Sequence, residues 1–117
     1  MKTFRELLVW QKSMDLVIEV YKFTRMFPKE ESYGLTAQIR RCAVSIPSNL
    51  AEGYGRNSKS ELNRFASISA GSLYELQTQL IVSSNLDFIE DRVDGLLNEL
   101  NQIQKMNYAL QKSLLRK

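Results

Sequence analysis

A proline inside an otherwise helical pattern constrains the fold of this chain most. Residues 38–56 read QIRRCAVSIPSNLAEGYGR, so that Pro47 and two glycines fall where apolar residues keep helical spacing. Proline removes a backbone donor and clashes with the preceding turn, which costs about 3 kcal/mol in a helix interior. The sequence therefore predicts a kink or a break at Pro47, within a helix that begins near Leu35.

The first predicted helix begins at Thr3, which has capping-box spacing to Glu6, and ends before Pro28. Two apolar stripes run along it, and each keeps helical spacing. The stripe that we assign to the core is Leu7, Trp10, Met14, Val17, Tyr21 and Thr24, and the second stripe is Val9, Leu16, Val20, Phe23 and Phe27. Two stripes exceed what one intramolecular partner would cover, so the excess predicts burial in an oligomer.

The second and third predicted helices meet at a glycine-containing segment. Gly53 and Gly55 supply backbone freedom to end the second helix, and Ser58 with Glu61 forms a capping box that opens the third. The apolar stripe of the second helix is Leu35, Ile39, Cys42, Ala43, Ile46 and Leu50, and that of the third is Leu62, Phe65, Ile68, Ser69, Leu73, Leu76 and Leu80. Small residues at positions 66, 67 and 69–72 predict the close approach of a neighbouring helix.

The fourth predicted helix begins near Asp87 and Glu90 and has the clearest pattern. Its stripe is Val93, Leu96, Leu100, Ile103, Asn107, Leu110 and Leu114. Four long helices joined by short connections favour an antiparallel bundle. The sequence therefore predicts an all-α, antiparallel up-and-down four-helix bundle with a Pro-kinked second helix, in a single domain that spans residues 1–117.

The composition excludes most familiar catalytic chemistry. The chain contains no histidine and one cysteine, Cys42, which excludes an intramolecular disulfide, the common zinc sites and histidine-dependent nucleophiles. We therefore predict no catalytic residue, no metal site, no cofactor and no enzymatic activity.

No apolar run approaches the ~18 residues of a membrane span, so we expect a cytoplasmic protein with no membrane partner. The spacing of Cys42 from Ile39 and Ile46 predicts a small core residue rather than a reactive thiol.

Basic residues cluster in the middle of the chain, although the net charge is only +3. The candidate nucleic-acid-binding bases are Arg40, Arg41, Arg56, Lys59 and Arg64, five bases against the two acids Glu52 and Glu61. Tyr54 is the aromatic candidate for stacking on a base, whereas Trp10 and Tyr21 share the predicted core stripe. The bases could form a rim that binds phosphates, or a solvated face paired with the two glutamates, and for one protomer we favour the solvated face. A symmetric ring would repeat the rim and make it multivalent.

A second candidate constellation surrounds the proline. The candidate kink and interface residues are Pro47, Asn49, Glu52, Gly53 and Gly55. They could build a polar pocket or a subunit contact, or they could satisfy the backbone groups that the proline frees, which we favour. A catalytic role would need a second acid or a nucleophile at suitable spacing, which this segment lacks.

Three segments carry a resemblance to a known family. They read FPKEESYGLTAQIRR at 27–41, SIPSNLAEGYGR at 45–56 and GSLYELQTQL at 71–80. In this order they resemble the bacterial four-helix-bundle family that is also called the ribosomal RNA intervening-sequence protein family, over about Phe4 to Ile89, while the fourth helix matches only in pattern. The resemblance implies a bundle that assembles into a ring-like homopentamer. It also implies kinship with proteins encoded inside ribosomal RNA gene insertions, and with accessory proteins of retroelement reverse transcriptases.

Two functions are consistent with these observations. The first is a non-enzymatic homo-oligomeric scaffold associated with ribosomal or retroelement-type RNA, motivated by the basic segment and by the resemblance. The alternative is an adaptor that docks a nucleic-acid enzyme without binding RNA itself. The excess apolar stripe motivates the adaptor, as does the stretch from Asp87 to Glu99, where five acids face one arginine.

Overall fold

The computed structural model describes residues 3–88 and 93–116, and regular structure within these ranges is helical throughout. The four α-helices are α1 (Leu8–Thr24), α2 (Leu35–Gly55), α3 (Lys59–Asn85) and α4 (Val93–Leu114). Two 3-10 helices precede α1 and α2, at η1 (Phe4–Glu6) and η2 (Lys29–Glu31). The prediction of an all-α protein with four long helices is confirmed. None of the described helices is both long and apolar enough to cross a membrane.

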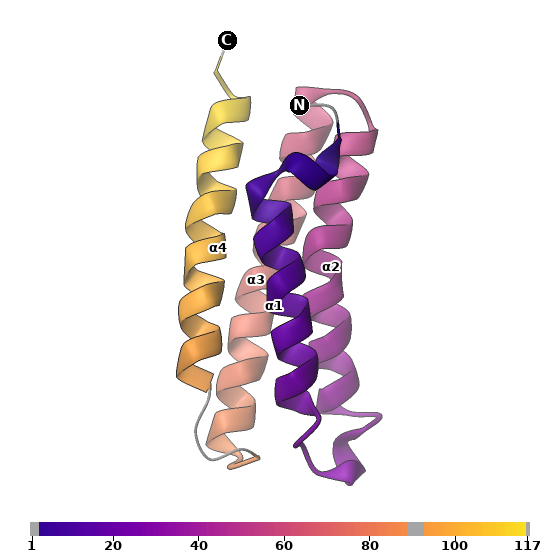
Figure 1. Ribbon diagram of the computed structural model, residues 1–117, viewed down its shortest axis with the longest axis vertical. Coiled ribbons are helices and arrows are strands. Elements are labelled where there is room, and N and C mark those ends of the chain that lie inside the picture. The colour runs from indigo at the N-terminus through magenta and orange to yellow at the C-terminus, as the bar shows by residue number, and fades with distance from the viewer. Residues whose placement is uncertain (1–2, 89–92, 117) are drawn as a thin grey trace.

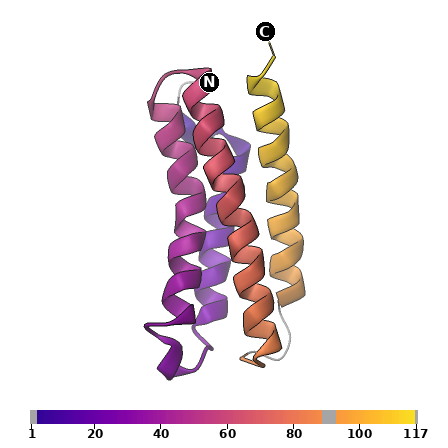
Figure 2. The ribbon, with the colours of Figure 1, turned by 180° about the vertical axis from the view of Figure 1, so that it is seen from behind.

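The four helices lie side by side along the long axis of a molecule that measures 48 × 23 × 19 Å (Figure 1). Each packs against two others: α1 and α3 both contact α2, and both contact α4. The connection between α1 and α2 lies at one end of the molecule, and the turn between α2 and α3 lies at the opposite end (Figures 1 and 2). This packing is that of a helical bundle around one central core.

The core takes large aliphatic side chains from every helix. Its most deeply buried members are Leu16, Val20, Ile39, Ile46, Leu50, Leu73, Leu76, Leu80 and Leu100. Burying one such side chain contributes roughly 1.5–3 kcal/mol, so this cluster is the main source of stability. The stripes predicted for the second and fourth helices are confirmed at the positions nearest this core, where Ile39, Ile46, Leu100 and Ile103 are buried.

The assignment of stripes on α1 is correct only in part. Leu7, Val17 and Thr24 of the predicted core stripe are buried, but so is the whole second stripe, which was predicted to be the excess face: Val9, Leu16, Val20, Phe23 and Phe27. Met14 and Tyr21 are exposed instead, and Trp10 is half-buried with its ring centroid 5.1 Å from that of Phe4. Both stripes have the helical period, and the period alone does not say which face the neighbouring helices cover. Ile68 of α3 is likewise exposed, although its spacing predicted burial.

The ends of α1 also differ from the prediction. Thr3 caps the short helix η1, where its Oγ1 accepts from the backbone N of Arg5 at 3.3 Å, so the capping box does not open α1. The α-helix itself begins at Leu8 and ends at Thr24, several residues before Pro28. Pro28 instead begins the turn of η2, where its fixed φ suits a helix start.

The end of α2 uses its glycines differently from the prediction. Neither glycine there has a positive φ; the left-handed residue after the helix is Asn57, at φ 61°. A Cβ added to Gly53 would lie 2.6 Å from the Cβ of Phe65, closer than real Cβ atoms approach. Gly53 therefore allows α2 and α3 to pack closely, which is a packing role rather than a conformational one.

The start and end of α3 are both capped. Ser58 Oγ accepts from the backbone N of Glu61 at 3.0 Å, which confirms the predicted N-cap. At the other end Asp87 adopts a left-handed φ of 57° and closes α3, so it does not begin the fourth helix. Glu90, the other predicted start residue, lies outside the described residues.

Candidate nucleic-acid interface

The predicted basic residues fall into two groups, one on α2 and one around the turn between α2 and α3. Sixteen residues separate Arg40 from Arg56, which at 1.5 Å per residue corresponds to about 24 Å along the helix. Arg40 and Arg41 therefore lie in the first half of α2, while Arg56, Lys59 and Arg64 surround the turn into α3. The structure does not bring the five bases together into one patch on a single protomer.

Arg40 is engaged within the bundle. Its Nε donates to Thr24 Oγ1 at 2.8 Å, its Nη2 donates to the carbonyl of Tyr21 at 3.4 Å, and its guanidinium lies 4.6 Å from the centroid of the Tyr21 ring. These contacts place a cation at the carboxyl end of α1, where the helix dipole favours positive charge. Arg40 thus ties α2 to the last turn of α1, while its neighbour Arg41 is exposed.

The turn between α2 and α3 gathers the remaining bases, and we call Arg56, Lys59 and Arg64 the basic turn. Arg56 Nη2 lies 2.9 Å from Glu52 Oε2, and Arg64 Nε lies 2.9 Å from Glu61 Oε2. Arg56 Nη1 also lies 3.8 Å from Glu61 Oε1. The turn therefore holds three bases and two acids, so its net charge is +1 on one protomer.

The ion pairs of the basic turn are solvent-exposed. The hydrogen bond from Arg64 lowers the pKa of Glu61, and the charges of Arg64 and Arg56 act in the same direction. Exposed pairs of this kind contribute little to stability, because water solvates both partners when the pair separates. An incoming phosphate can therefore replace either carboxylate as the partner of an arginine.

The ring of Phe65, which the sequence placed in the core, contacts both arginines of the basic turn. The guanidinium of Arg64 lies 4.5 Å from the centroid of Phe65, and that of Arg56 lies 5.2 Å from it. Phe65 is 6% exposed, so its ring holds the arginines in place and offers no face to a nucleic-acid base. The stripe pattern predicted that Phe65 is buried, but nothing in the sequence pointed to these contacts.

Tyr54, the predicted stacking residue, is half-buried and packs against the hydrophobic core. The most exposed tyrosines are Tyr33, which is fully exposed, and Tyr74, which is 63% exposed. Tyr74 lies on α3, away from the basic turn. The geometry therefore supplies phosphate-binding groups at this end of the bundle but places no open aromatic face between them.

Two side chains near Pro47 donate to backbone carbonyls of α2, and neither carbonyl is that of Ala43, whose helical donor the proline removes. Asn49 Nδ2 donates to the carbonyl of Ser45 at 2.7 Å, and Ser69 Oγ of α3 donates to the carbonyl of Ile46 at 2.6 Å. Pro47 itself is buried, and α2 stays helical through it, so the helix does not break there. Glu52 is not part of this network, because it faces solvent and pairs with Arg56.

Cys42 belongs to the contact between α2 and α3. Its Sγ donates to the carbonyl of Ser72 at 3.1 Å, and the thiol is buried. Burial raises the pKa of Cys42 to about 12, and the nearby carboxylate of Glu75 adds to the increase. The thiol is therefore protonated at neutral pH, as a core cysteine is, and not poised as a nucleophile.

Over the parts of the chain that the structure describes, no three metal-ligating side chains gather in one place.

These features define the class as a small all-α bundle protein with an arginine-rich turn at one end. The chain belongs to the family of the 23S rRNA-intervening sequence protein, whose model matches residues 5–109. The resemblance seen in the sequence is thus confirmed, and the match continues into α4.

A crystal structure of a protein of unknown function from the S23 ribosomal protein family of Bacteroides thetaiotaomicron superposes with a TM-score of 0.82. That superposition covers 90% of this chain and 96% of the other at 19% sequence identity, so it bears on the fold alone. No curated protein matches the sequence.

Proposed function

We propose that this chain is a non-enzymatic, homo-oligomeric scaffold, most simply a homopentamer, that associates with ribosomal or retroelement-type RNA in the cytoplasm. The proposal takes the bundle as antiparallel and up-and-down, with α2 kinked at Pro47, and the cyclic symmetry of a ring would place the α2–α3 turn of every protomer at the same end. The family's name, which refers to 23S rRNA, supports the choice of RNA as partner. The observation that carries the proposal is the basic turn.

The basic turn has the chemistry of a phosphate site. The planar guanidinium groups of Arg56 and Arg64 can each donate two parallel hydrogen bonds to a phosphate, and Lys59 adds an exposed point charge. Both arginines are already positioned over the ring of Phe65, which limits the side-chain entropy lost on binding. One turn with a net charge of +1 would bind weakly, so the proposal depends on repetition in an oligomer.

Apolar side chains that one protomer leaves in solvent support self-association. Leu8 and Ile18 of α1 are 57% and 54% exposed, and Ile68 of α3 is 43% exposed. Gly71, near Ile68, has open space where a Cβ would lie, so the protomer itself gives no packing reason for a glycine in mid-helix. A second copy could cover these positions, and the mass of the protein in solution tests that idea.

The RNA part of the proposal is tested by a triple substitution in the basic turn: Arg56→Gln, Lys59→Gln and Arg64→Gln. The probe is a fluorescein-labelled RNA hairpin, titrated by anisotropy at several salt concentrations. Each lost phosphate contact should reduce the slope of log affinity against log salt by about 0.7–0.9. We expect the triple variant to bind more weakly and with a shallower slope than the wild type. Arg40 is kept intact because it ties α2 to α1.

A matched control removes the same charge elsewhere. Arg25, Lys29 and Lys105 are exposed bases outside the turn, and their replacement by glutamine also lowers the net charge by three. The control should keep most of the affinity and slope of the wild type. If both triple variants lose affinity equally, binding follows net charge and the basic turn is not the site.

The alternative function is an adaptor that docks a nucleic-acid enzyme without contacting RNA. The exposed apolar residues of α1 and α3 favour it, because they suit a protein partner as well as a second copy. Under this alternative the wild type and the basic-turn variant should show the same weak RNA binding, and both should recover the same protein partner. An RNA affinity that falls steeply with salt and depends on the turn would exclude the adaptor.

A further inference from the structure

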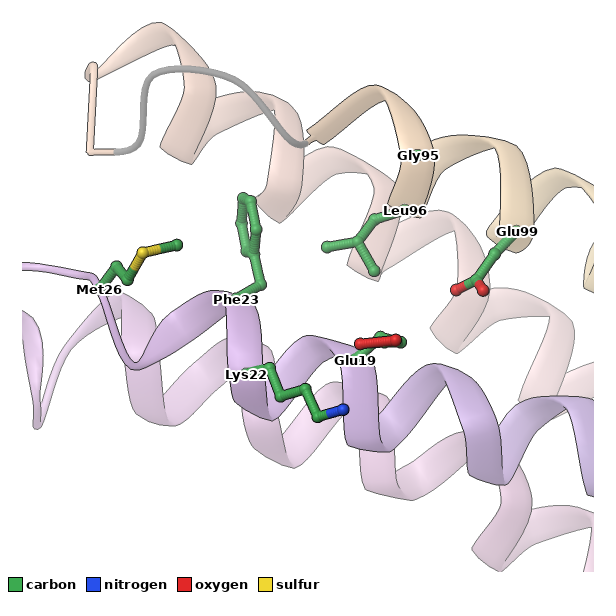
Figure 3. Close-up of a pocket in the computed structure, with 7 residues that line it drawn as sticks. All are labelled: Glu19, Lys22, Phe23, Met26, Gly95, Leu96 and Glu99. Carbon is green, nitrogen blue, oxygen red and sulfur yellow. The ribbon is translucent and has the colours of Figure 1, made fainter.

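A groove runs between α1 and α4, on elements that carry none of the basic turn. It measures about 530 Å³ and is lined by Glu19, Lys22, Phe23, Met26, Gly95, Leu96 and Glu99. Figure 3 shows Phe23 and Leu96 lying between the two helices, with Met26 at one end of the same face. A volume in this range is typical of sites that bind a side chain or a small ligand.

Two carboxylates, one from each helix, lie beside the apolar floor of the groove, which is formed by Phe23, Met26 and Leu96. Glu19 of α1 and Glu99 of α4 direct their carboxylates toward the space between the helices (Figure 3). In the described part of the chain neither carboxylate forms an ion pair, even though Lys22 lines the same groove. Partial burial raises the pKa of Glu99, the charges of Glu19 and Asp15 add to the increase, and Lys12 opposes it. The groove therefore holds two carboxylates and one ammonium, a net charge of −1.

The groove is open above Gly95. A Cβ built at this glycine would have no atom within 4 Å, so packing inside the protomer does not require a glycine there. A glycine in a helix costs about 1 kcal/mol relative to alanine, and here no internal contact recovers that cost. Its missing side chain leaves the apolar floor accessible beside Glu99.

We propose that the α1–α4 groove docks a basic amphipathic segment of a partner protein, with a lysine or arginine between Glu19 and Glu99 and apolar side chains on Phe23, Met26 and Leu96. Charge complementarity selects this occupant, because the carboxylates repel RNA and attract a cation. The apolar floor needs an occupant that carries aliphatic groups as well, which the leucines of an amphipathic helix supply at three- and four-residue spacing. The inference goes beyond the proposed RNA-associated role, since it uses no residue of the basic turn.

The test uses a fluorescein-labelled peptide of about 15 residues, long enough to form a helix when bound, with leucines at helical spacing and lysines beside them. Anisotropy titration should show saturable binding to the wild type. The double variant Glu19→Gln/Glu99→Gln should bind about tenfold more weakly, since two carboxylate–cation contacts are lost. Glu30→Gln/Glu75→Gln removes the same charge from exposed positions on other elements and should bind like the wild type.

A second variant blocks the groove without touching its charges. Gly95→Leu places a side chain over the apolar floor, and the open space at this position lets the protein fold, which circular dichroism checks. We expect this variant to lose peptide binding while its RNA affinity stays at the wild-type value. Equal peptide affinity in the wild type, the glutamine pair and Gly95→Leu would overturn the proposal.

Two further results would also overturn it. If 1,4-diaminobutane alone binds the wild type as tightly as the peptide does, the groove is a site for a small organic cation. If Gly95→Leu lowers the molecular mass of the protein in light scattering, a second copy of this chain covers the groove. The first result does not bear on the basic turn. The second would also lower the RNA affinity of Gly95→Leu, because multivalent binding depends on the oligomer. Loss of RNA binding in the basic-turn variant bears only on the RNA proposal.

Discussion

At the scale of single residues, several side chains have roles that depend on a neighbour far away in the sequence. Arg40 looked like a phosphate ligand next to Arg41, but it contacts the last turn of α1, sixteen residues earlier. Gly53 looked like a helix terminator, but it is the point where α2 meets Phe65. Sequence spacing predicts which face of a helix a residue occupies, and it cannot predict which residue of another helix faces it.

Gly53 gives a direct test of the α2–α3 contact. Gly53→Ala should destabilise the protein by about 1–3 kcal/mol, because the added Cβ meets Phe65 and the helices must move apart. Gly55→Ala is the control, since the same Cβ finds nothing within 4 Å and φ there is not positive. Urea denaturation measures the stability of both variants. Equal unfolding midpoints would contradict the close packing of Gly53 against Phe65.

Cys42 predicts a pH dependence with a definite sign. Its pKa is raised from 9.0 to about 12 in the folded protein, so the folded state disfavours the thiolate. The contribution of Cys42 to stability is therefore complete below pH 9 and is lost as the pH rises toward 12. Cys42→Val should lack this component, so the free-energy difference between wild type and variant should change in that window. A constant difference from pH 8 to about 11 would contradict the burial of the thiol.

At the scale of elements, polar groups in the core fix how the helices align. Asn107 of α4 is fully buried; its Nδ2 donates to the carbonyl of Ala66 on α3 at 3.2 Å, and its Oδ1 accepts from Gln111 at 2.6 Å. A buried amide of this kind specifies one register between two helices. The apolar pattern predicted that Asn107 faces the core. Its hydrogen-bond partner, the carbonyl of Ala66, could not be predicted from the sequence, because it depends on how α3 packs against α4.

Asn107→Ala should therefore cost about 1–3 kcal/mol, since it removes a buried hydrogen bond and leaves a small cavity. Asn101→Ala, on the exposed face of α4, should change stability by less than about 0.5 kcal/mol. Chemical denaturation measures both. If the exposed substitution is as costly as the buried one, Asn107 does not lock α3 to α4.

The variant Pro47→Ala tests whether the proline acts on the subunit contact or on the helix itself. Pro47→Ala restores a backbone donor within α2, and its helical content should change little because α2 is already continuous. If the proline shapes a subunit contact, the variant should change molecular mass more than circular dichroism. Unchanged mass with unchanged stability would show that the proline is tolerated rather than used.

At the scale of the whole molecule, the sequence predicted more of the fold than of the sites. Regular apolar stripes were enough to predict four helices, because each helix is long and its apolar residues recur with the helical period. They were not enough to choose the buried face of α1, where Phe23 and Tyr21 both have helical spacing. The bases of the basic turn lie within one stretch, residues 56–64, so the sequence could name them, whereas the α1–α4 groove joins residues 19–26 to residues 95–99 and is contained in no single stretch.

Assembly is the first whole-molecule prediction. A homopentamer should have five times the 13.5 kDa mass of the chain, close to 68 kDa, in light scattering after size exclusion. The exposed Leu8, Ile18 and Ile68 would then be covered, so Ile18→Glu should lower the mass if α1 contributes to the interface. A monomeric mass at micromolar concentration would contradict the assembly and, with it, the multivalent basic turn.

The measurement that tests the central claim most directly is to recover the tagged protein from its host after cross-linking, then sequence bound RNA and identify bound proteins in the same sample. The account predicts enrichment of ribosomal or retroelement RNA with the wild type, and its loss with Arg56→Gln/Lys59→Gln/Arg64→Gln. Protein partners without enriched RNA, or equal RNA recovery from both proteins, would contradict the RNA-associated scaffold.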